Sequence, residues 1–243
     1  MPTVLILGAA SDMAVAIARK YATEKYAVQL AARKPEQLYA LQQDLQIRAG
    51  VPVTTHAFDA LDFASHPAFY RQLEVKPDIV ICVFGYLGDQ QAAQSDWNEA
   101  ARILHTNYTG AVSILNVVAE DMAARQSGAI IGISSVAGDR GRMSNYLYGS
   151  AKAGFTAYLS GLRNRLFHTG VHVMSVQPGF VNTRMTENLT LPPLLTAQPE
   201  EVAKDIFKGA AARRNVIYTK WFWRYIMFII RNIPEFIFKK LKL

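Results

Sequence analysis

The sequence predicts an α/β fold, in which a parallel β-sheet is covered by helices on both faces. Short apolar runs alternate with segments of helical spacing along most of the chain, and this order implies right-handed β-α-β crossovers. The first apolar run leads into a turn of small residues, Gly8-Ala9-Ala10-Ser11, and then into a helix. With 243 residues, of which 51% are hydrophobic and 19% charged, the chain can bury one large core. A single doubly wound domain is therefore expected.

The expected strands are short and mostly apolar, as is typical of strands buried on both faces of a parallel sheet. They are expected at residues 4–7, 27–31, 53–58, 79–83, 129–134 and 171–177. The helices between them show helical apolar spacing, and they are expected at residues 14–26, 35–49, 66–73, 96–125 and 148–168. A further helix is expected to begin at Gln198, because a proline and two acidic residues follow it. This arrangement is typical of a Rossmann-type fold.

The positive charge is concentrated at the C-terminal end. Residues 213–243 contain eight basic residues and one acidic residue, a net charge of +7 that equals the formal charge of the whole chain. The remainder is neutral overall, so nucleic-acid binding is not expected. The single cysteine, Cys82, lies in an apolar run and has no partner for an internal disulfide, which indicates a reducing compartment. The chain begins with a strand rather than a secretory signal, so a cytoplasmic protein is expected.

The sequence indicates a catalytic domain at residues 1–212 and a basic, amphipathic, aromatic-rich segment at residues 213–243. Lys220, Arg224 and Arg231 are spaced by four and seven positions, so in a helix they share one face. The apolar run at residues 225–230 is far shorter than the ~20 residues that span a bilayer. We expect the segment to lie on a membrane surface. The alternative is that it packs on the protein's own core or on another subunit, and a homodimer is a further expectation.

One residue spacing predicts proton-transfer chemistry. Tyr148 and Lys152 are four positions apart and share a helix face, and Ser135 can reach them from the end of the preceding strand. A phenol has a pKa near ~10 in water and is a poor acid–base catalyst at neutral pH unless a fixed cation favours its phenolate. We expect Lys152 to supply that cation and to lower the pKa of Tyr148. The alternative is an ordinary surface pair.

Ligands of such sheets bind outside the carboxyl ends of the strands, so the residues after each strand are candidate ligand contacts. The turn that begins at Gly8 leads to a helix N-terminus, which can hold a phosphate group. Arg33 follows the second strand and can meet a 2′-phosphate or an adenine ring, and Asp59 follows the third strand and can accept from an adenine amine. The five histidines lack the spacing of a metal site, so no metal is expected.

Together these residues resemble the short-chain dehydrogenase/reductase family, over almost the whole predicted domain. The active-site residues of that family fall at Asn107, Ser135, Tyr148 and Lys152. The resemblance implies an oxidoreductase that interconverts ketones and alcohols with NAD(H) or NADP(H). In it Tyr148 would exchange the proton with the substrate, Ser135 would orient the carbonyl oxygen, and Asn107 would hold a water that links Lys152 to solvent.

The resemblance also implies a cofactor site along the strand ends and a Pro-Gly loop. Its expected members are Gly8, Ala10, Ser11, Asp12, Met13, Arg33, Asp59, Ala60, Phe84, Gly85, Tyr148, Lys152, Pro178, Gly179, Val181 and Thr183. Arg33, with alanines rather than acids before it, favours NADP(H), whereas the carboxylate of Asp12 near the phosphates favours NAD(H); the balance favours NADP(H). The expected substrate contacts are Tyr86, Leu87, Met143 and Tyr146.

Several segments depart from the family pattern and resemble one subgroup, the decaprenylphosphoryl-2-keto-ribose reductases. They include Asp12 and Ala14 in place of two glycines, the run at residues 84–89 and the run at residues 183–185. This resemblance implies reduction of the 2-keto group of a pentose linked to a polyprenyl phosphate, for cell-envelope arabinose synthesis, at the inner face of the cell membrane. An FAD-dependent oxidase would be its partner. The alternatives are a reductase of another hydrophobic or lipid ketone, such as a keto-sphingoid or a sterol, and a non-catalytic NAD(P)-binding sensor.

Overall fold

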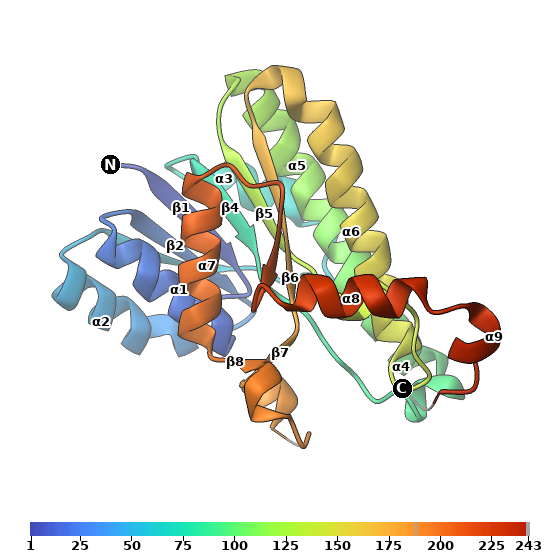
Figure 1. Ribbon diagram of the computed structural model, residues 1–243. Helices are drawn as coiled ribbons and strands as arrows, with labels where there is room; N and C mark the ends of the chain where they lie inside the picture. Colours follow the sequence, from blue (N-terminus) through green and yellow to red (C-terminus); the bar gives the residue numbers. More distant parts are fainter. Residues whose placement is uncertain (188, 242–243) are drawn as a thin grey trace.

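A computed structural model of the chain describes residues 1–187 and 189–241. Its centre is a seven-stranded parallel sheet in the order β3-β2-β1-β4-β5-β6-β9 (Figure 1). The chain order reverses between β1 and β4, so a ligand crevice is expected at the carboxyl ends of these two strands. The strands are β1 (Thr3–Leu7), β2 (Ala27–Ala32), β3 (Val53–Ala57), β4 (Ile79–Cys82), β5 (Ala129–Ile133), β6 (His172–Pro178) and β9 (Val216–Thr219).

Helices cover both faces of the sheet and bury it completely at its centre (Figure 1). One face carries α1 (Asp12–Thr23), α2 (Tyr39–Ala49) and α7 (Pro199–Ala211). The other carries α3 (His66–Gln72), α5 (Gly110–Arg125) and α6 (Tyr146–Leu166). Successive side chains of a strand point to opposite faces, and accordingly Val4 and Ile6 of β1 join the first core while Leu5 and Leu7 join the second. The predicted doubly wound fold is confirmed.

The helix expected at residues 96–125 is present but contains a wider turn. It consists of α4 (Trp97–Leu104), one π-helical turn (His105–Thr109) and α5. The side chain of Asp96 begins it by accepting from the backbone N–H of Asn98 at 2.9 Å. Such single π turns occur frequently at functional sites, and this one contains Asn107.

The boundary expected at residue 213 does not separate two structural parts. Residues 216–219, which we assigned to the C-terminal segment, form β9 and pair with β6 at the edge of the sheet. The strand is four residues long and lies between Arg214 and Lys220, so the basic composition of its surroundings concealed it. The last two residues of the predicted segment, Lys242 and Leu243, lie outside the described residues.

The chain continues after β9 into α8 (Trp223–Asn232) and α9 (Glu235–Phe238). Trp223 and Met227 of α8 are buried and pack on Val136. The side chains of Trp221, Tyr225, Phe228 and Ile229 are 61–71% exposed. The segment therefore has one apolar side on the body of the protein and a second apolar side facing outward. Within residues 1–187 and 189–241, no helix has the length and apolar character that crossing a membrane requires.

Arg140, from the loop that precedes α6, fastens the end of α8 to the body. Its Nη1 donates to the carbonyl oxygens of Ile230, Arg231 and Ile233 at 3.1, 2.9 and 2.7 Å. Its Nη2 pairs with Glu235 at 2.7 Å. The last carbonyl groups of a helix lack partners inside the helix, so one guanidinium satisfies several of them and ties α8 and α9 to the loop.

Candidate active site

A groove of about 340 Å³ lies where the sheet order reverses, along the strand ends. Its lining comes from the loops after β1, β2, β3 and β4 and from the segment after β6. The structure brings together in this groove most of the expected cofactor contacts and one expected substrate contact. They are Gly8, Ala10, Ser11, Asp12, Met13, Arg33, Asp59, Ala60, Phe84, Gly85, Thr183 and Tyr86.

The turn after β1 is tight because Gly8 has no side chain. Its φ is +92°, and a Cβ at this position would lie 2.7 Å from the backbone N of Phe84, so another residue would be strained and would push the groove apart. Ser11 then caps α1, its hydroxyl accepting from the N–H of Ala14 at 3.3 Å. The N–H groups of Asp12 and Met13 have no acceptor within the helix. The groove therefore has an anion-binding helix N-terminus at its centre.

Ser135 and Lys152 are held beside Tyr148 by close packing of one turn on one helix. Ser135 begins a short helical turn (Val136–Gly138), and its hydroxyl accepts from the N–H of Ala137 at 3.1 Å. A Cβ at Gly138 would lie 2.7 Å from the backbone N of Ala153 in α6. Since only a glycine permits this approach, the turn lies directly against the helix that carries Tyr148 and Lys152.

The Lys152 ammonium is buried at the base of this group. Its Nζ donates to the carbonyl oxygen of Ile133 at 3.0 Å and lies 5.7 Å from the centroid of the Tyr148 ring. The neighbouring Ser134 points away, because its hydroxyl donates to the Lys152 carbonyl at 3.0 Å and lies 2.6 Å from the Thr156 hydroxyl. The structure thus leaves Ser135, rather than Ser134, next to the phenol.

Burial shifts both titrating groups toward their neutral forms. It raises the pKa of Tyr148 to about 12, and a hydrogen bond with the Ser135 side chain only partly opposes that rise. It lowers the pKa of Lys152 to about 8. The expected lowering of the Tyr148 pKa by Lys152 is therefore wrong for this structure, because loss of hydration outweighs the other influences on the phenol. Tyr148 is a protonated phenol throughout the neutral range.

Asn107 joins the π turn to the loop after β4. Its Nδ2 donates to the carbonyl oxygens of Tyr86 and Ile103 at 2.6 and 2.8 Å, and its Oδ1 accepts from the N–H of Tyr86 at 3.1 Å. A Cβ at Gly85 would lie 3.0 Å from Oδ1 and 3.6 Å from the Nζ of Lys152. Asn107, Gly85 and Lys152 thus converge at the inner end of the groove. The water expected at Asn107 stays a prediction.

The Pro-Gly loop lies mostly outside the groove. Pro178 ends β6, and Val181 is buried in the core beside α7. A Cβ at Gly179 would lie 2.0 Å from the indole Nε1 of Trp223, so this glycine makes room for the C-terminal helix. Only Thr183, of the four loop residues expected to contact the cofactor, lines the groove.

The expected substrate contacts differ in how firmly they are held. The Tyr86 hydroxyl donates to Glu99 at 2.9 Å, and the ring packs with Tyr148 on the same small apolar cluster. Leu87 is half-buried. Met143 and Tyr146 are exposed, in the loop before α6 and in its first turn. Tyr86 is therefore the one that the structure fixes next to the phenol.

Several residues of the groove were not expected from the sequence. Arg102 and Thr106 reach it from α4 and the π turn, and Arg184 and Met185 reach it from the segment after β6. Their participation depends on tertiary packing and left no spacing signal. The other missed lining residues are Ala32, Phe58, Leu61 and Val83. Among the described residues, no group of three or more His, Cys, Asp or Glu side chains is placed to hold a metal ion.

The groove suits a long ligand with an anionic centre. Arg33 and Asp59 lie at one end, the α1 N-terminus lies in the middle, and Gly85 lies at the end beside Lys152. Gly8 lets the turn after β1 pack directly on Phe84, and Gly85 lets the groove wall approach Asn107 and Lys152. This arrangement fits a dinucleotide, whose diphosphate would bind at the helix N-terminus.

Comparisons with known proteins agree with this geometry. The sequence model of the short chain dehydrogenase family matches residues 2–193. An uncharacterized oxidoreductase of Mycobacterium tuberculosis is 36% identical over 241 residues, which cover 98% of this chain and 96% of that protein. Another from Streptomyces coelicolor is 34% identical over 242 residues, covering 98% and 95%. The structure of a short-chain dehydrogenase from Sphingobium yanoikuyae in complex with NADPH superposes with a TM-score of 0.83, covers 97% of both chains and is 24% identical.

Proposed function

The chain belongs to the short-chain dehydrogenase/reductase family, and we propose that it works as an NAD(P)(H)-dependent ketone reductase. The observation that carries this proposal is the group formed by Ser135, Tyr148 and Lys152. These residues lie behind the groove lining, and Lys152 is next to Gly85 of that lining. Ketone reduction beside a nicotinamide requires a proton donor, a hydroxyl that orients the carbonyl oxygen and a buried cation.

Different residues of the site would hold different parts of the cofactor. Arg33 and Asp59 would hold the adenosine end, the free N–H groups of Asp12 and Met13 the diphosphate, and Lys152 the nicotinamide ribose. When bound, the cofactor supplies the hydride. Because Ala31 and Ala32 place no carboxylate at the end of β2, nothing there repels a 2′-phosphate, and Arg33 favours it. We therefore propose a preference for NADP(H).

Tyr148 is the proton donor in the proposed reaction. Its raised pKa keeps the phenol protonated at neutral pH, which is the form that the reduction of a ketone consumes. Ser135 would donate to the carbonyl oxygen and orient it. After proton transfer, the ammonium of Lys152 stabilises the phenolate. Its own pKa of about 8 allows Lys152 to return a proton at neutral pH, through the water proposed at Asn107.

We propose that the substrate is the 2-keto form of a pentose linked to a polyprenyl phosphate. The sequence resemblance supports this choice, and so does an exposed apolar side formed by Trp221, just before α8, and by Tyr225, Phe228 and Ile229 of α8. Arg224 and Arg231 lie in α8, whereas Lys220, which we expected on the same helix face, precedes the helix. The charge of all three complements anionic lipid headgroups. The protein would work at the inner face of the cell membrane, together with an FAD-dependent oxidase that makes the ketone.

The experiment that tests the proposal is oxidation of NADPH and NADH by the purified protein with a synthetic polyprenyl-phosphate 2-keto pentose and with a panel of simple hydrophobic ketones. Turnover of the sugar lipid with a large preference over the panel supports the full proposal. Turnover of the panel alone supports a ketone reductase and rejects the sugar lipid as its substrate. If the protein binds the cofactor but turns over none of the ketones, the proposal of a ketone reductase is wrong.

A further inference from the structure

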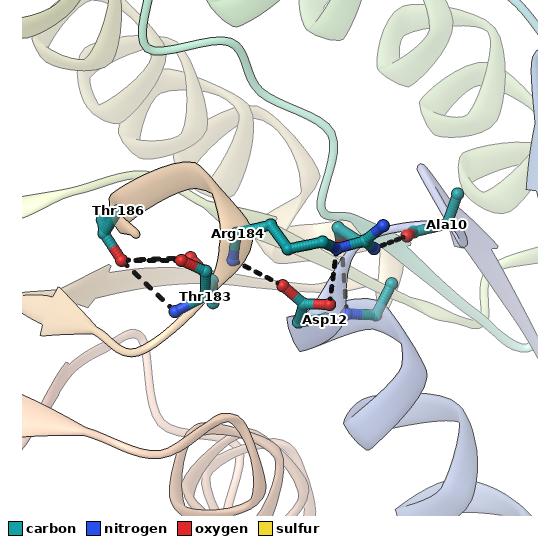
Figure 2. Close-up of polar contacts among 7 residues, drawn as sticks. Ala10, Asp12, Thr183, Arg184 and Thr186 are labelled. Carbon is teal, nitrogen blue, oxygen red and sulfur yellow. Dashed lines mark hydrogen bonds and ion pairs between the residues drawn. The ribbon is translucent and has the colours of Figure 1, made fainter. Parts of the chain in front are cut away.

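An ion pair in the lining of the groove joins two residues that are far apart in the chain. Figure 2 shows Arg184, from the short helical turn Arg184–Thr186, reaching Asp12 at the start of α1. The guanidinium Nε lies 3.0 Å from Asp12 Oδ1, and the backbone N–H of Arg184 donates to Oδ2 at 2.7 Å. The guanidinium Nη2 also donates to the carbonyl oxygen of Ala10 at 2.6 Å. Both oxygens of the carboxylate are thus used.

The turn that carries Arg184 is held by hydrogen bonds of its own. The Thr186 hydroxyl donates to the carbonyl oxygen of Val181 at 2.7 Å. It also accepts from the N–H of Thr183 at 3.2 Å (Figure 2). These bonds fix the direction of the Arg184 backbone N–H. Asp12 therefore accepts from a backbone N–H that the turn holds in place as well as from a charged side chain, which sets this contact apart from an ordinary surface pair.

Asp12 alone would be unfavourable at this position. It is the first residue of α1 and lines the groove beside the free N–H groups that suit an anion. A carboxylate there repels a diphosphate. Arg184 cancels its charge and brings a second function, because a guanidinium has five N–H donors and the contacts to Asp12 and Ala10 use two of them. The remaining donors are held at the edge of the groove.

We propose that Asp12 and Arg184 act as one unit, in which Asp12 holds the Arg184 guanidinium over the α1 N-terminus as a ligand for the diphosphate of the dinucleotide. This inference rests on the proposed use of NAD(P)(H). Arg184 replaces the close backbone approach that a glycine at position 12 would allow. Neutralisation of Asp12 by Arg184 also explains how the phosphate-binding turn can contain an acidic residue and still suit an anion.

A double-mutant cycle on cofactor binding tests the unit. We expect Arg184→Met to weaken NADPH binding by about tenfold, which is the loss of about 1.4 kcal/mol. Asp12→Asn in the native background is expected to weaken NADPH binding several-fold, because the guanidinium loses the carboxylate that positions it. In the Arg184→Met background the same Asp12→Asn change is expected to tighten binding, because it removes an unneutralised carboxylate. The dissociation constants are measured by fluorescence of bound NADPH, and by calorimetry with ADP-ribose, which carries the diphosphate without the nicotinamide.

The exposed pair of Asp44 and Arg48 on α2 is the matched control, and Asp44→Asn with Arg48→Met should leave both dissociation constants unchanged. Melting curves of all variants show whether they are folded. The sign reversal of Asp12→Asn between the two backgrounds, seen with both ligands, supports the unit. Equal effects of Asp12→Asn in the two backgrounds, or tighter binding in the native background, overturn it. Failure of the native protein to bind NADPH or NADH refutes the proposed function and this inference with it.

Discussion

Raising the pH should switch off ketone reduction through Lys152 rather than through Tyr148. Burial lowers the pKa of Lys152 from its ordinary value of 10.5 to about 8 and raises that of Tyr148 to about 12. A lysine with a lowered pKa carries its charge below that pKa and loses it above. The ammonium that stabilises the phenolate is thus present below pH 8, while the phenol stays protonated far above it.

The size of the effect follows from the titration of one group. One pH unit above its pKa about one tenth of the lysine is charged, so kcat/KM should be level below about pH 8 and then fall about tenfold for each further pH unit. The assay is NADPH oxidation with a water-soluble ketone between pH 6 and 10. Parallel measurement of the NADPH dissociation constant separates weaker cofactor binding from loss of the charge on Lys152.

A level profile up to pH 10 would refute the reasoning, because it would place the Lys152 pKa near its ordinary value despite burial. A decline that tracks the NADPH dissociation constant alone would assign the pH effect to cofactor binding. Replacement of Lys152 by methionine should abolish nearly all of the activity and remove the decline of kcat/KM above pH 8, while the protein keeps its fold.

Four further outcomes are expected. Tyr148→Phe should abolish turnover and leave the NADPH dissociation constant nearly unchanged; measurable reductase activity would remove Tyr148 as the proton donor. Arg33→Ala should raise the KM for NADPH about tenfold with little change for NADH, and a tenfold preference for NADH in both proteins would contradict the NADP(H) proposal. Trp223→Ala should lower the free energy of unfolding by roughly 3–5 kcal/mol in a denaturant titration, because Trp223 is 4% exposed and packs on Gly179; a change below about 1 kcal/mol would contradict this packing. Phe228→Glu should reduce sedimentation with anionic vesicles without changing turnover of a water-soluble ketone, whereas Ile47→Glu, at a similarly exposed apolar residue of α2, should change neither.

Local patterns predicted most of the fold. The apolar run at residues 4–7 of β1 and the alternation of strands with helices are properties of short segments, and all six expected strands are present. β9 was missed because its four residues become recognisable as a strand only through pairing with β6. Its flanking basic residues pointed toward a surface segment instead.

The site was predictable where it depends on spacing along one element. Tyr148 and Lys152 share a face of α6, and Ser135 follows β5. The contact of Asp12 with Arg184 could not be predicted, since 172 positions separate the two residues. The direction of the Tyr148 pKa shift was also predicted wrongly. The spacing of Tyr148 and Lys152 indicates a nearby cation, but it does not show the loss of hydration that burial imposes.

The packing of Trp223 on Gly179 limits how the role of the C-terminal segment can be studied. Truncation before α8 would uncover the loop that leads to Thr183 and Arg184 and would leave the Arg140 guanidinium without its carbonyl partners. A shortened protein would thus lose stability and alter its cofactor site together with any affinity for lipid. The proposed membrane contact can be tested apart from catalysis only by substitutions on the outward side of α8, where the side chains touch solvent and the groove is left intact.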